Sequence, residues 1–195
     1  MKYGSGRDPY LNQEGVLKNK LGAKTEEELE LAETIFVLRK LTLLLQKQIE
    51  GKFDLAHLKA IHKFLFDEVY EWAGELRTIS ISKGSSMFEL PLRIEPEANK
   101  LFAQLKAENY LRELALEPFI QRLAFYWGEL NMLHPFREGN GRTQRAFLIL
   151  LARQAGHQIH FGQLSPEENI KASIKSQRCD YSLLEQIIRQ RIKQL

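Results

Sequence analysis

The sequence is poor in cysteine and in long apolar runs. Cys179 is the single cysteine among 195 residues, so an internal disulfide and a cysteine-based zinc site are both excluded. The longest apolar run, from Ala146 to Ala152, is far too short to span a membrane. The first ten residues, MKYGSGRDPY, lack the apolar segment of a signal peptide. We therefore expect a cytoplasmic protein without membrane contact, while translocation into another cell stays open.

A strong charge of either sign is also lacking. Lys and Arg number 28 and Asp and Glu number 25, which gives a formal net charge of +3. So small an excess does not indicate direct nucleic-acid binding. The excess is uneven, because residues 134–195 hold ten basic and five acidic side chains. An anionic ligand bound there and a solvated helix face explain this local excess equally well.

The composition predicts one globular domain over residues 1–195. Hydrophobic residues make up 44% of the chain and charged residues 27%, which is typical of a folded protein rather than a disordered one. A chain of this length buries enough surface to be stable without disulfides. We find no internal repeat or low-complexity tract that would divide it.

Helical periodicity dominates after an irregular arm over residues 1–24, which is rich in Gly, Asn and Pro signals. Spacings of three and four residues predict helices over residues 25–49, 54–74, 95–110, 118–133, 141–155, 166–177 and 181–194. Thr25 and Asp54 are the expected N-caps of the first two helices. In the first helix, the residues expected to face the core are Leu31, Ile35, Leu38, Leu41 and Leu45.

One segment, residues 76–91, has a β pattern instead. LRTISIS alternates with period two, KGSS predicts a turn, and MFEL predicts a short returning strand. An isolated hairpin is marginal in water, so we expect this one to pack on helices. The predicted fold class is mainly α, with one small β-hairpin.

The stretch HPFREGNGRTQR, residues 134–145, joins two of the predicted helices. Pro135 and the glycines end the first helix, so the first half of the stretch predicts a loop. The backbone N–H groups of Gly139, Asn140 and Gly141 would then lie together at the N-terminus of the helix that follows. A helix N-terminus attracts anions, and glycine lets a phosphate approach the backbone closely.

The charged side chains of this stretch favour an oligophosphate ligand. Arg142 and Arg145 lie three residues apart and share one helix face. Two guanidinium groups beside a cluster of N–H donors suit several phosphates better than one carboxylate. Glu138 would repel phosphates unless a cation bridged them, as Mg²⁺ (or Mn²⁺) does. His134 can act as a general base near neutral pH.

Each of these features alone is common in proteins without a ligand. A histidine before proline is usually structural, and a glycine-rich helix start is often only a turn. Their coincidence within twelve residues favours a site. It is not a Walker A loop, because the lysine and the spacing are missing. His157 and His160 would face opposite sides of a strand or turn, which favours a structural role over metal binding. Phe136 is expected to anchor the loop in the core, and His62 to line the core.

Residues 134–145 resemble the motif H-x-F-x-[DE]-G-N-G-R-x-x-R of the Fic family and fit it at every specified position. The resemblance covers nearly the whole chain, since the arm GSGRDPYLNQEGVLKNKLG also resembles that of single-domain Fic toxins. It implies the Fic fold, a helical bundle with a β-hairpin flap beside the active-site loop. It also implies a protein adenylyltransferase, which transfers AMP from ATP to a hydroxyl side chain of a target protein and releases pyrophosphate.

The resemblance implies a role for each motif residue. His134 would deprotonate the target hydroxyl, and Glu138 would hold Mg²⁺ or Mn²⁺. The residues that would bind the phosphates of ATP are Glu138 through the cation, Gly139, Asn140, Gly141, Arg142 and Arg145.

The segment from Thr78 to Phe88 resembles the family's flap, which pairs with the backbone of the target as an added strand. Its candidate target-binding residues are Ser80, Ile81, Ser82, Lys83, Gly84 and Phe88. The resemblance to Fic toxins implies a bacterial type II topoisomerase, DNA gyrase or topoisomerase IV, as the target.

The resemblance also implies a small inhibitory protein, an antitoxin, supplied in trans. Fic proteins that restrain themselves carry a helix with the pattern [ST]-x-x-x-E-[GN], whose glutamate pairs with the second motif arginine. Here only Ser85 and Glu89 have the first five positions of that pattern, and they fall in the predicted hairpin. Arg145 is therefore the expected contact of a carboxylate from another chain.

Two other functions stay open on the sequence alone. A similar loop could hold another nucleotide-linked or phosphoryl donor, as in a phosphotransferase or a phosphocholine-type transferase. A helical module without catalysis, which binds DNA or a protein partner, is the second alternative.

Overall fold

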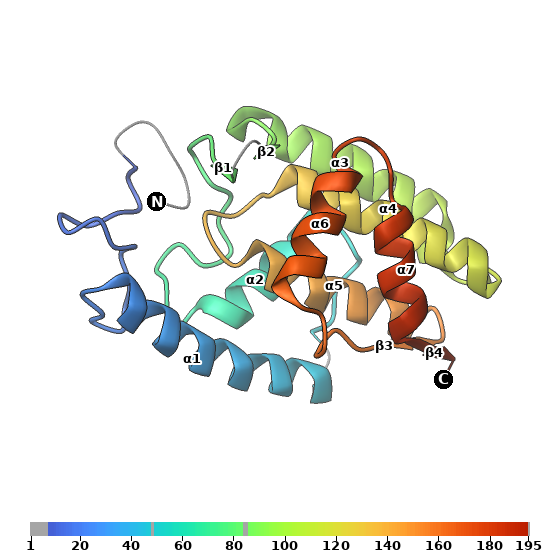
Figure 1. Ribbon diagram of the computed structural model, residues 1–195, viewed down its shortest axis with the longest axis horizontal. Coiled ribbons are helices and arrows are strands. Elements are labelled where there is room, and N and C mark those ends of the chain that lie inside the picture. Colours follow the sequence, from blue (N-terminus) through green and yellow to red (C-terminus); the bar gives the residue numbers. More distant parts are fainter. Residues whose placement is uncertain (1–7, 48, 84–85, 195) are drawn as a thin grey trace.

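The structure is a computed structural model that describes residues 8–47, 49–83 and 86–194. These residues form a mainly helical protein (Figure 1), as the sequence predicts. The helices are α1 (Glu26–Gln46), α2 (Leu55–Phe66), α3 (Pro91–Ala107), α4 (Leu116–Leu133), α5 (Asn140–Gln154), α6 (Pro166–Ser176) and α7 (Ser182–Arg191). A short 3₁₀ turn, Asn109–Leu111, joins α3 to α4. Two small antiparallel sheets pair β1 (Ser82–Lys83) with β2 (Ser86–Met87) and β3 (His157–Ile159) with β4 (Ile192–Gln194).

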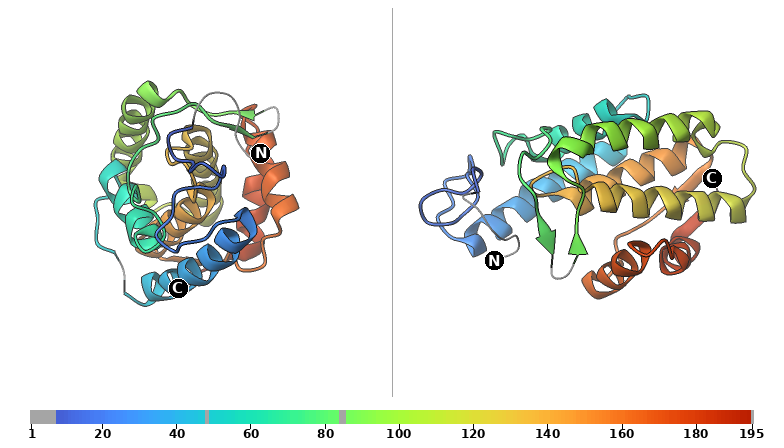
Figure 2. Two further views of the ribbon diagram at one scale, coloured as in Figure 1. Left: turned by 90° about the vertical axis from the view of Figure 1, so that its left-hand side faces the viewer. Right: turned by 90° about the horizontal axis from the view of Figure 1, so that it is seen from above.

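The core is built around α4 and α5, the helices on either side of the motif loop. Figure 2 shows this pair in the middle of the molecule, surrounded by α1, α2, α3 and the α6–α7 pair. Their buried faces carry Phe119, Trp127 and Phe147, each at most 2% exposed. Because α5 packs on both α2 and α4, the loop between α4 and α5 is held at both ends. The site therefore lies on a rigid scaffold.

The predicted caps of the first two helices are confirmed. The Thr25 hydroxyl accepts the backbone N–H of Glu28, and the Asp54 carboxylate accepts that of His57. Each bond satisfies one of the backbone donors that have no partner inside the helix. Sequence and structure agree here because a cap depends only on residues that are neighbours in the chain.

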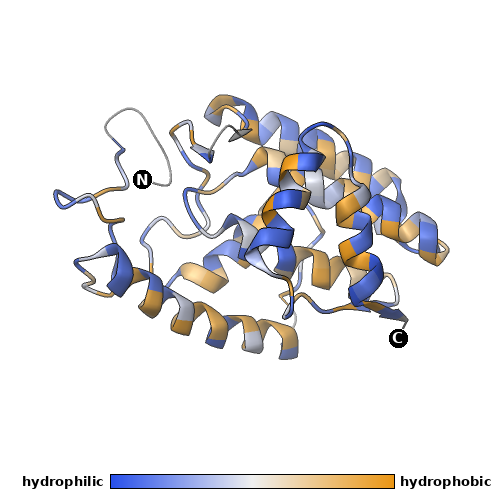
Figure 3. Cartoon of the chain, viewed as in Figure 1, coloured by the Kyte–Doolittle hydropathy of each residue, from blue (hydrophilic) through white to orange (hydrophobic). Residues whose placement is uncertain are grey.

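The core-facing stripe predicted for α1 is wrong for its first three residues, whereas Leu41 and Leu45 are half-buried against the core. Leu31, Ile35 and Leu38 are 66%, 61% and 63% exposed, and the buried side chains of α1 are Leu29, Glu33, Val37 and Leu44. Orange bands recur along α1 in Figure 3 because the helix is apolar on both faces. The buried face also carries a carboxylate, so counting apolar residues selects the wrong side.

The flap is smaller than the sequence predicts. A strand is expected over residues 76–82, but only Ser82 and Lys83 pair, opposite Met87 and Ser86. The N–H of Arg77 instead donates to the carbonyl oxygen of Pro135, at 2.9 Å. This limb of the flap therefore lies against the motif loop rather than in a ladder.

Other element boundaries also differ from the prediction. The second helix ends at Phe66, because residues 67–74 form turns that close on Gly74, whose φ of +86° suits glycine. The third begins at Pro91 rather than Glu95, since proline suits the first turn of a helix. The sheet of β3 and β4 is missing from the prediction, which extended the last helix over residues that form β4.

The arm over the described residues 8–24 is irregular, as predicted, and is tied to the body of the protein. The N–H of Lys20 donates to the carbonyl of Val69 at 2.9 Å. The Asp8 carboxylate pairs with the Arg137 guanidinium at 2.7 Å, and both side chains are at most 10% exposed. Since Arg137 belongs to the motif, the arm stabilises the loop from outside. Among the described residues, no helix is long and apolar enough to cross a membrane.

Candidate active site

The motif loop is closed by its own side chains. The Asn140 amide donates to the carbonyl of Phe136 at 2.7 Å and accepts the N–H of Phe136 at 2.9 Å. The ring of Phe136 is 1% exposed and stacks on His62 with centroids 3.9 Å apart. Phe136 therefore anchors the loop in the core, as predicted, and Asn140 has a structural role besides its place at the helix start.

Glycine is required at position 139 for two reasons. Its φ is +79°, which side-chain-bearing residues rarely adopt, and an added Cβ would lie 2.3 Å from the Phe66 ring. The Gly139 N–H donates to its neighbour Glu138 at 3.0 Å in this structure. Helix α5 starts at Asn140, so the N–H groups of its first turn, Gly141 included, point out of the helix where an anion can bind.

His134 is held as a neutral base. Its Nδ1 lies 3.2 Å from the carbonyl oxygen of Asn131, which can only accept, so Nδ1 carries the proton and Nε2 keeps a lone pair. Burial lowers the pKa of His134 from 6.5 to about 3, and the positive charges of Arg77 and Lys83 contribute. The imidazole stacks on Phe88 at 3.7 Å. The ring is therefore uncharged at neutral pH and can accept a proton at Nε2.

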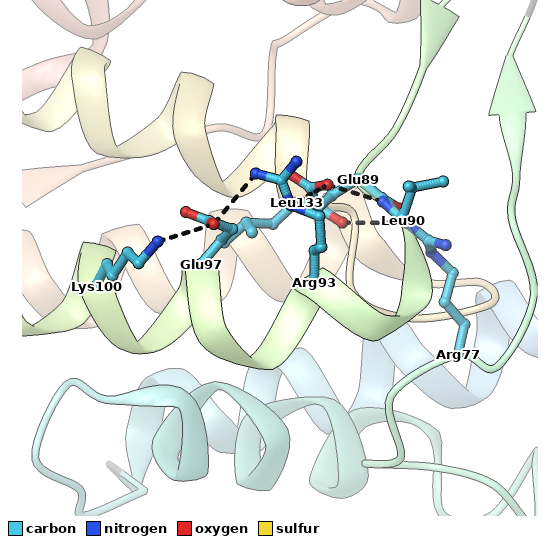
Figure 4. Close-up of polar contacts among 7 residues, drawn as sticks. All are labelled: Arg77, Glu89, Leu90, Arg93, Glu97, Lys100 and Leu133. Carbon is cyan, nitrogen blue, oxygen red and sulfur yellow. Dashed lines mark hydrogen bonds and ion pairs between the residues drawn. The ribbon is translucent and has the colours of Figure 1, made fainter.

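Arg77 joins the flap to this histidine, a link that the sequence analysis missed. Its guanidinium is 2% exposed and donates to four backbone carbonyls. The acceptors are His134 at 2.8 Å, Ile79 at 2.7 Å, Leu133 at 3.4 Å, and Glu89. Figure 4 shows Arg77 reaching from one limb of the flap toward Glu89 and Leu133. The Arg77 guanidinium therefore binds the backbone of both limbs of the flap and the backbone of His134.

Two of the predicted flap residues, Lys83 and Phe88, act on His134 in the structure. Phe88 and Ile81 are buried, Ser82 is half-buried, and Ser80 and Lys83 are exposed. Phe88 faces His134. Gly84, also predicted to bind the target, lies outside the described residues.

The carboxylate of Glu138 lies between the helix start and a guanidinium. Its side chain is 20% exposed and its Oε1 lies 3.6 Å from Arg142. The backbone of Glu138 is fixed from below, because His62 Nε2 donates to its carbonyl at 3.0 Å while His62 Nδ1 accepts the N–H of Gly74. Burial lowers the pKa of His62 to about 3, so this ring is neutral too. His62 lines the core, as predicted, and also positions the loop.

Glu138 fits a divalent cation held mainly by phosphates. No cluster of three or more His, Cys, Asp or Glu side chains exists among the described residues, so the protein itself supplies no complete cation site. One partly exposed carboxylate beside an anion-binding helix start suits Mg²⁺, which keeps waters and substrate phosphates as its other ligands. His157 is buried and packs against Phe119, with ring centroids 4.2 Å apart and planes tilted by 38°, which agrees with the structural role expected for it.

The two motif arginines have different surroundings. Arg142 pairs with Glu33 of α1 at 2.6 Å, and its guanidinium lies 4.9 Å from the centre of the Phe66 ring. Arg145 has no ion pair or hydrogen bond with any residue that the structure describes. Burial, together with the charge of Arg142, lowers the pKa of Arg145 to about 10, so it stays charged at neutral pH.

Arg145 opens into a groove of about 530 Å³ between α1, α5 and the segment after β3. The residues lining it are Leu41, Leu45, Arg142, Arg145, Ala146, Ile149, Arg153 and residues 157–162. Three guanidinium groups and several apolar side chains face this space, and none of the described residues that line it carries a carboxylate. The groove suits an apolar segment that carries negative charge.

Comparison with known proteins relates this chain to the family that the motif resembles. Residues 52–152 match the model of the Fic/DOC family. The protein adenylyltransferase VbhT of Bartonella schoenbuchensis is 44% identical over 192 residues, which cover 98% of this chain and 40% of VbhT. This chain therefore spans less than half the length of that relative. The Fic protein of Salmonella typhimurium, named for the same activity, is 38% identical over 99% of this chain and 96% of its own length.

Solved structures share the fold. The BepC protein of Bartonella tribocorum, with bound AMPPNP, has a TM-score of 0.88 at 26% identity, covering 95% of this chain and 97% of BepC. A Fic domain from Bartonella quintana with bound ADP has a TM-score of 0.87 at 29% identity, covering 95% of this chain and 94% of that domain. With a family match over half its length and a full-length relative, the chain belongs to the Fic/DOC family.

Proposed function

We propose that this chain is a cytoplasmic protein adenylyltransferase, which transfers AMP from ATP to a hydroxyl side chain of a target protein. The observation that carries the proposal is the neutral His134, which keeps a lone pair on Nε2 and belongs to the same loop as the anion-attracting start of α5. The names of VbhT and the Salmonella Fic protein support the reaction. The nucleotides in the two Bartonella structures support ATP as the donor.

The reaction needs one proton acceptor and one anion-binding site. His134 Nε2 takes the proton of the target hydroxyl, whose oxygen then forms a bond to the α-phosphorus of ATP. The bond from the α-phosphorus to the bridging oxygen of the β-phosphate breaks, and pyrophosphate leaves with that electron pair. The N–H groups at the start of α5 and the Arg145 guanidinium offset the charge on the phosphates.

Glu138 would hold Mg²⁺ or Mn²⁺ in this site. When bound, the cation neutralises phosphate charge and holds the oligophosphate in one orientation. The hydrogen bond between His62 and the carbonyl oxygen of Glu138 fixes this part of the backbone. It thereby keeps the Glu138 side chain near the start of α5.

The target docks on the flap through its backbone. Strand β1 has only two residues and pairs on one side with β2, so its other edge can accept an added strand. Arg77 holds the flap at a fixed distance from His134, so a strand on this edge presents its hydroxyl to the base. We infer a bacterial type II topoisomerase as the target from the resemblance to Fic toxins.

A small antitoxin restrains the enzyme by filling the groove over Arg145. A helix with one apolar face would pack on Leu41, Leu45 and Ile149, and its glutamate would form a bidentate pair with Arg145. That pair occupies the guanidinium that binds the outer phosphates. Charge complementarity supports this occupant, since the described lining of the groove has three arginines and no Asp or Glu.

Transfer from ATP labelled in turn at the α- and γ-phosphate tests the proposal. Incubated with a bacterial lysate, the chain should attach α-label to a protein and leave γ-label in pyrophosphate. Attachment of γ-label would indicate a phosphotransferase instead. If neither label is transferred to any protein while nucleotide still binds, the binding-module alternative is favoured. Recovery and identification of the labelled protein tests the topoisomerase assignment separately.

A further inference from the structure

We propose that Glu33, a residue of α1 outside the motif, is a positioning residue that keeps Glu138 available to the divalent cation. Its carboxylate holds the Arg142 guanidinium at 2.6 Å and so prevents Arg142 from closing its 3.6 Å contact with Glu138 to a direct hydrogen bond. The inference rests on the proposed function only in taking Glu138 as the protein ligand of that cation. It gives the two motif arginines separate roles: both line the groove, but Arg142 is paired with Glu33, whereas Arg145 has no ion pair with any residue that the structure describes.

Glu33 is buried and fully engaged. It is 6% exposed, and its Oε1 lies 2.6 Å from a terminal nitrogen of Arg142. Its Oε2 accepts the hydroxyl of Tyr70. Burial raises the pKa of Tyr70, and the Glu33 charge adds to that effect, so the phenol stays a donor. A carboxylate in such a place is costly unless both oxygens have partners, and here both do.

Arg142 lies between two carboxylates but is bonded to one. The same terminal nitrogen is 2.6 Å from Glu33 and 3.6 Å from Glu138 Oε1. The Phe66 ring lies under the guanidinium at 4.9 Å and restricts its movement. The shorter contact is the charge-assisted hydrogen bond, and the longer one is a weaker electrostatic contact.

Removing the charge of Glu33 should redirect Arg142. The remaining carboxylate within reach in this network is Glu138, and a small rotation of the guanidinium would close the 3.6 Å gap. A direct Arg142–Glu138 pair competes with a cation for the same oxygen, because the cation must first displace the guanidinium. Glu33 thus acts on the cation through Arg142, without touching the cation or the nucleotide.

The opposite assignment makes a different prediction. If Arg142 were a phosphate ligand that Glu33 merely restrains, loss of the Glu33 charge would free it for ATP. Nucleotide would then bind more tightly without a cation, and the affinity for the cation would be unchanged.

Binding of Mn²⁺, followed by electron paramagnetic resonance with saturating AMPPNP, separates these cases. Glu33→Gln keeps the size and the Tyr70 partner and should weaken Mn²⁺ binding about fivefold, the scale of one partly exposed ion pair. Tyr70→Phe is the matched control, because it removes the other bond to Glu33 but leaves the charge; Mn²⁺ affinity should stay within about twofold. Glu33→Asp, with a shorter reach, should give a smaller loss of the same sign.

The decisive comparison is the double variant. In an Arg142→Gln background, Glu33→Gln should no longer change Mn²⁺ affinity, since no guanidinium remains to redirect. Unchanged Mn²⁺ affinity in Glu33→Gln, or a loss that persists without Arg142, would overturn the proposal. Circular dichroism and urea unfolding of each variant confirm the fold. No target is present in this measurement, so failure to transfer AMP would contradict the proposed function and leave this result intact.

Discussion

The ring of Phe88, from the flap, stacks on the imidazole of His134 with centroids 3.7 Å apart and planes 17° from parallel. One side chain of the element proposed to bind the target therefore covers the proposed base. This contact belongs to the burial that lowers the pKa of His134 to about 3. The flap thus influences the proton acceptor directly as well as through the backbone carbonyl that Arg77 binds.

Phe88→Ala should raise the pKa of His134 toward its ordinary value of 6.5, because the ring loses its cover. A base works only when unprotonated, so activity is lost as pH falls through its pKa. The acid limb of kcat/KM should move up by about one to two pH units relative to the parent. Phe88→Leu, which keeps an apolar cover, should leave the limb in place. An unchanged limb in Phe88→Ala would show that another group sets it.

His134→Ala should abolish AMP transfer and leave nucleotide binding intact. The imidazole is the proton acceptor, whereas the N–H groups at the start of α5 do not depend on it. We expect a rate loss of about 10²- to 10⁴-fold and a nucleotide Kd within about threefold of the parent. Lys106→Ala, at an exposed side chain in the last turn of α3, is the control and should keep the parent rate. Transfer by His134→Ala above a few per cent of the parent rate would remove His134 as the base.

Arg77→Lys should destabilise the protein and impair target modification together. Lysine keeps the charge but cannot reach carbonyls on both flap limbs and on His134, which leaves buried acceptors without donors. We expect a loss of about 2–4 kcal/mol in the free energy of unfolding. The control is Arg93→Lys, whose guanidinium is exposed and pairs at the surface with Glu89 and Glu97, as Figure 4 shows.

Urea unfolding measures both variants, and Arg93→Lys should stay within about 0.5 kcal/mol of the parent. In the assay with target, Arg77→Lys should raise the KM for the target protein more than the KM for ATP. Equal effects on both constants would mean that Arg77 stabilises the whole fold without a specific effect on the flap.

Acid should weaken the fold because two histidines are buried as neutral rings. The pKa values of His62 and His134 are lowered to about 3, whereas an unfolded chain protonates histidine near 6.5. Between these values the unfolded state binds more protons, so stability falls as pH drops from about 6.5 toward 3. The slope approaches about 1.4 kcal/mol per pH unit for each such histidine.

Urea midpoints between pH 7 and pH 4 measure that slope. His62→Gln removes one titrating ring, so its slope over this range should be clearly smaller than the parent slope, whatever its stability at pH 7. Parallel curves for the two proteins would mean that His62 is not a buried neutral group.

The motif residues could be predicted from the sequence because they are consecutive and each has a chemical reason for its place. The caps Thr25 and Asp54 were predictable because their partners are neighbours in the chain, and the burial of Phe136 because its apolar ring interrupts a polar loop, although its partner His62 is distant in sequence. Glu33 could not be predicted. It meets Arg142 only through the packing of α1 on the core, and α1 is apolar on both faces, so periodicity selects the face of Leu31 instead.

The first limb of the flap, residues 76–82, also could not be predicted fully from the sequence. LRTISIS has the alternation of a strand, but the N–H of Arg77 finds its acceptor at Pro135, in a loop distant in sequence. Period-two patterning shows that a segment is extended and half-buried, and it does not show which backbone will pair with it. The role of Arg77 follows from that tertiary pairing and therefore has no signal in the local sequence.

Expressed alone in a bacterial host, the chain should inhibit growth, and a co-expressed small helical protein with a suitably placed glutamate should relieve the inhibition. The groove beside Arg145 takes that helix, so a negative charge in its apolar lining should repel it. Ile149→Asp should therefore restore toxicity in the presence of the inhibitor while AMP transfer by the purified variant continues. Leu92→Asp, at a side chain that is 94% exposed on α3, is the matched control and should remain inhibited.

Growth curves and transfer assays on the same strains test whether a separate inhibitor restrains the chain and whether it binds in this groove. Normal growth with the lone chain, when the purified protein is folded yet shows no ATP-dependent transfer, would mean that it is restrained without a partner. Continued inhibition of Ile149→Asp by the small protein would move the docking site away from this groove. If the lone chain inhibits growth and Ile149→Asp escapes the inhibitor, the Arg145 guanidinium is the group that pairs with a carboxylate from another chain.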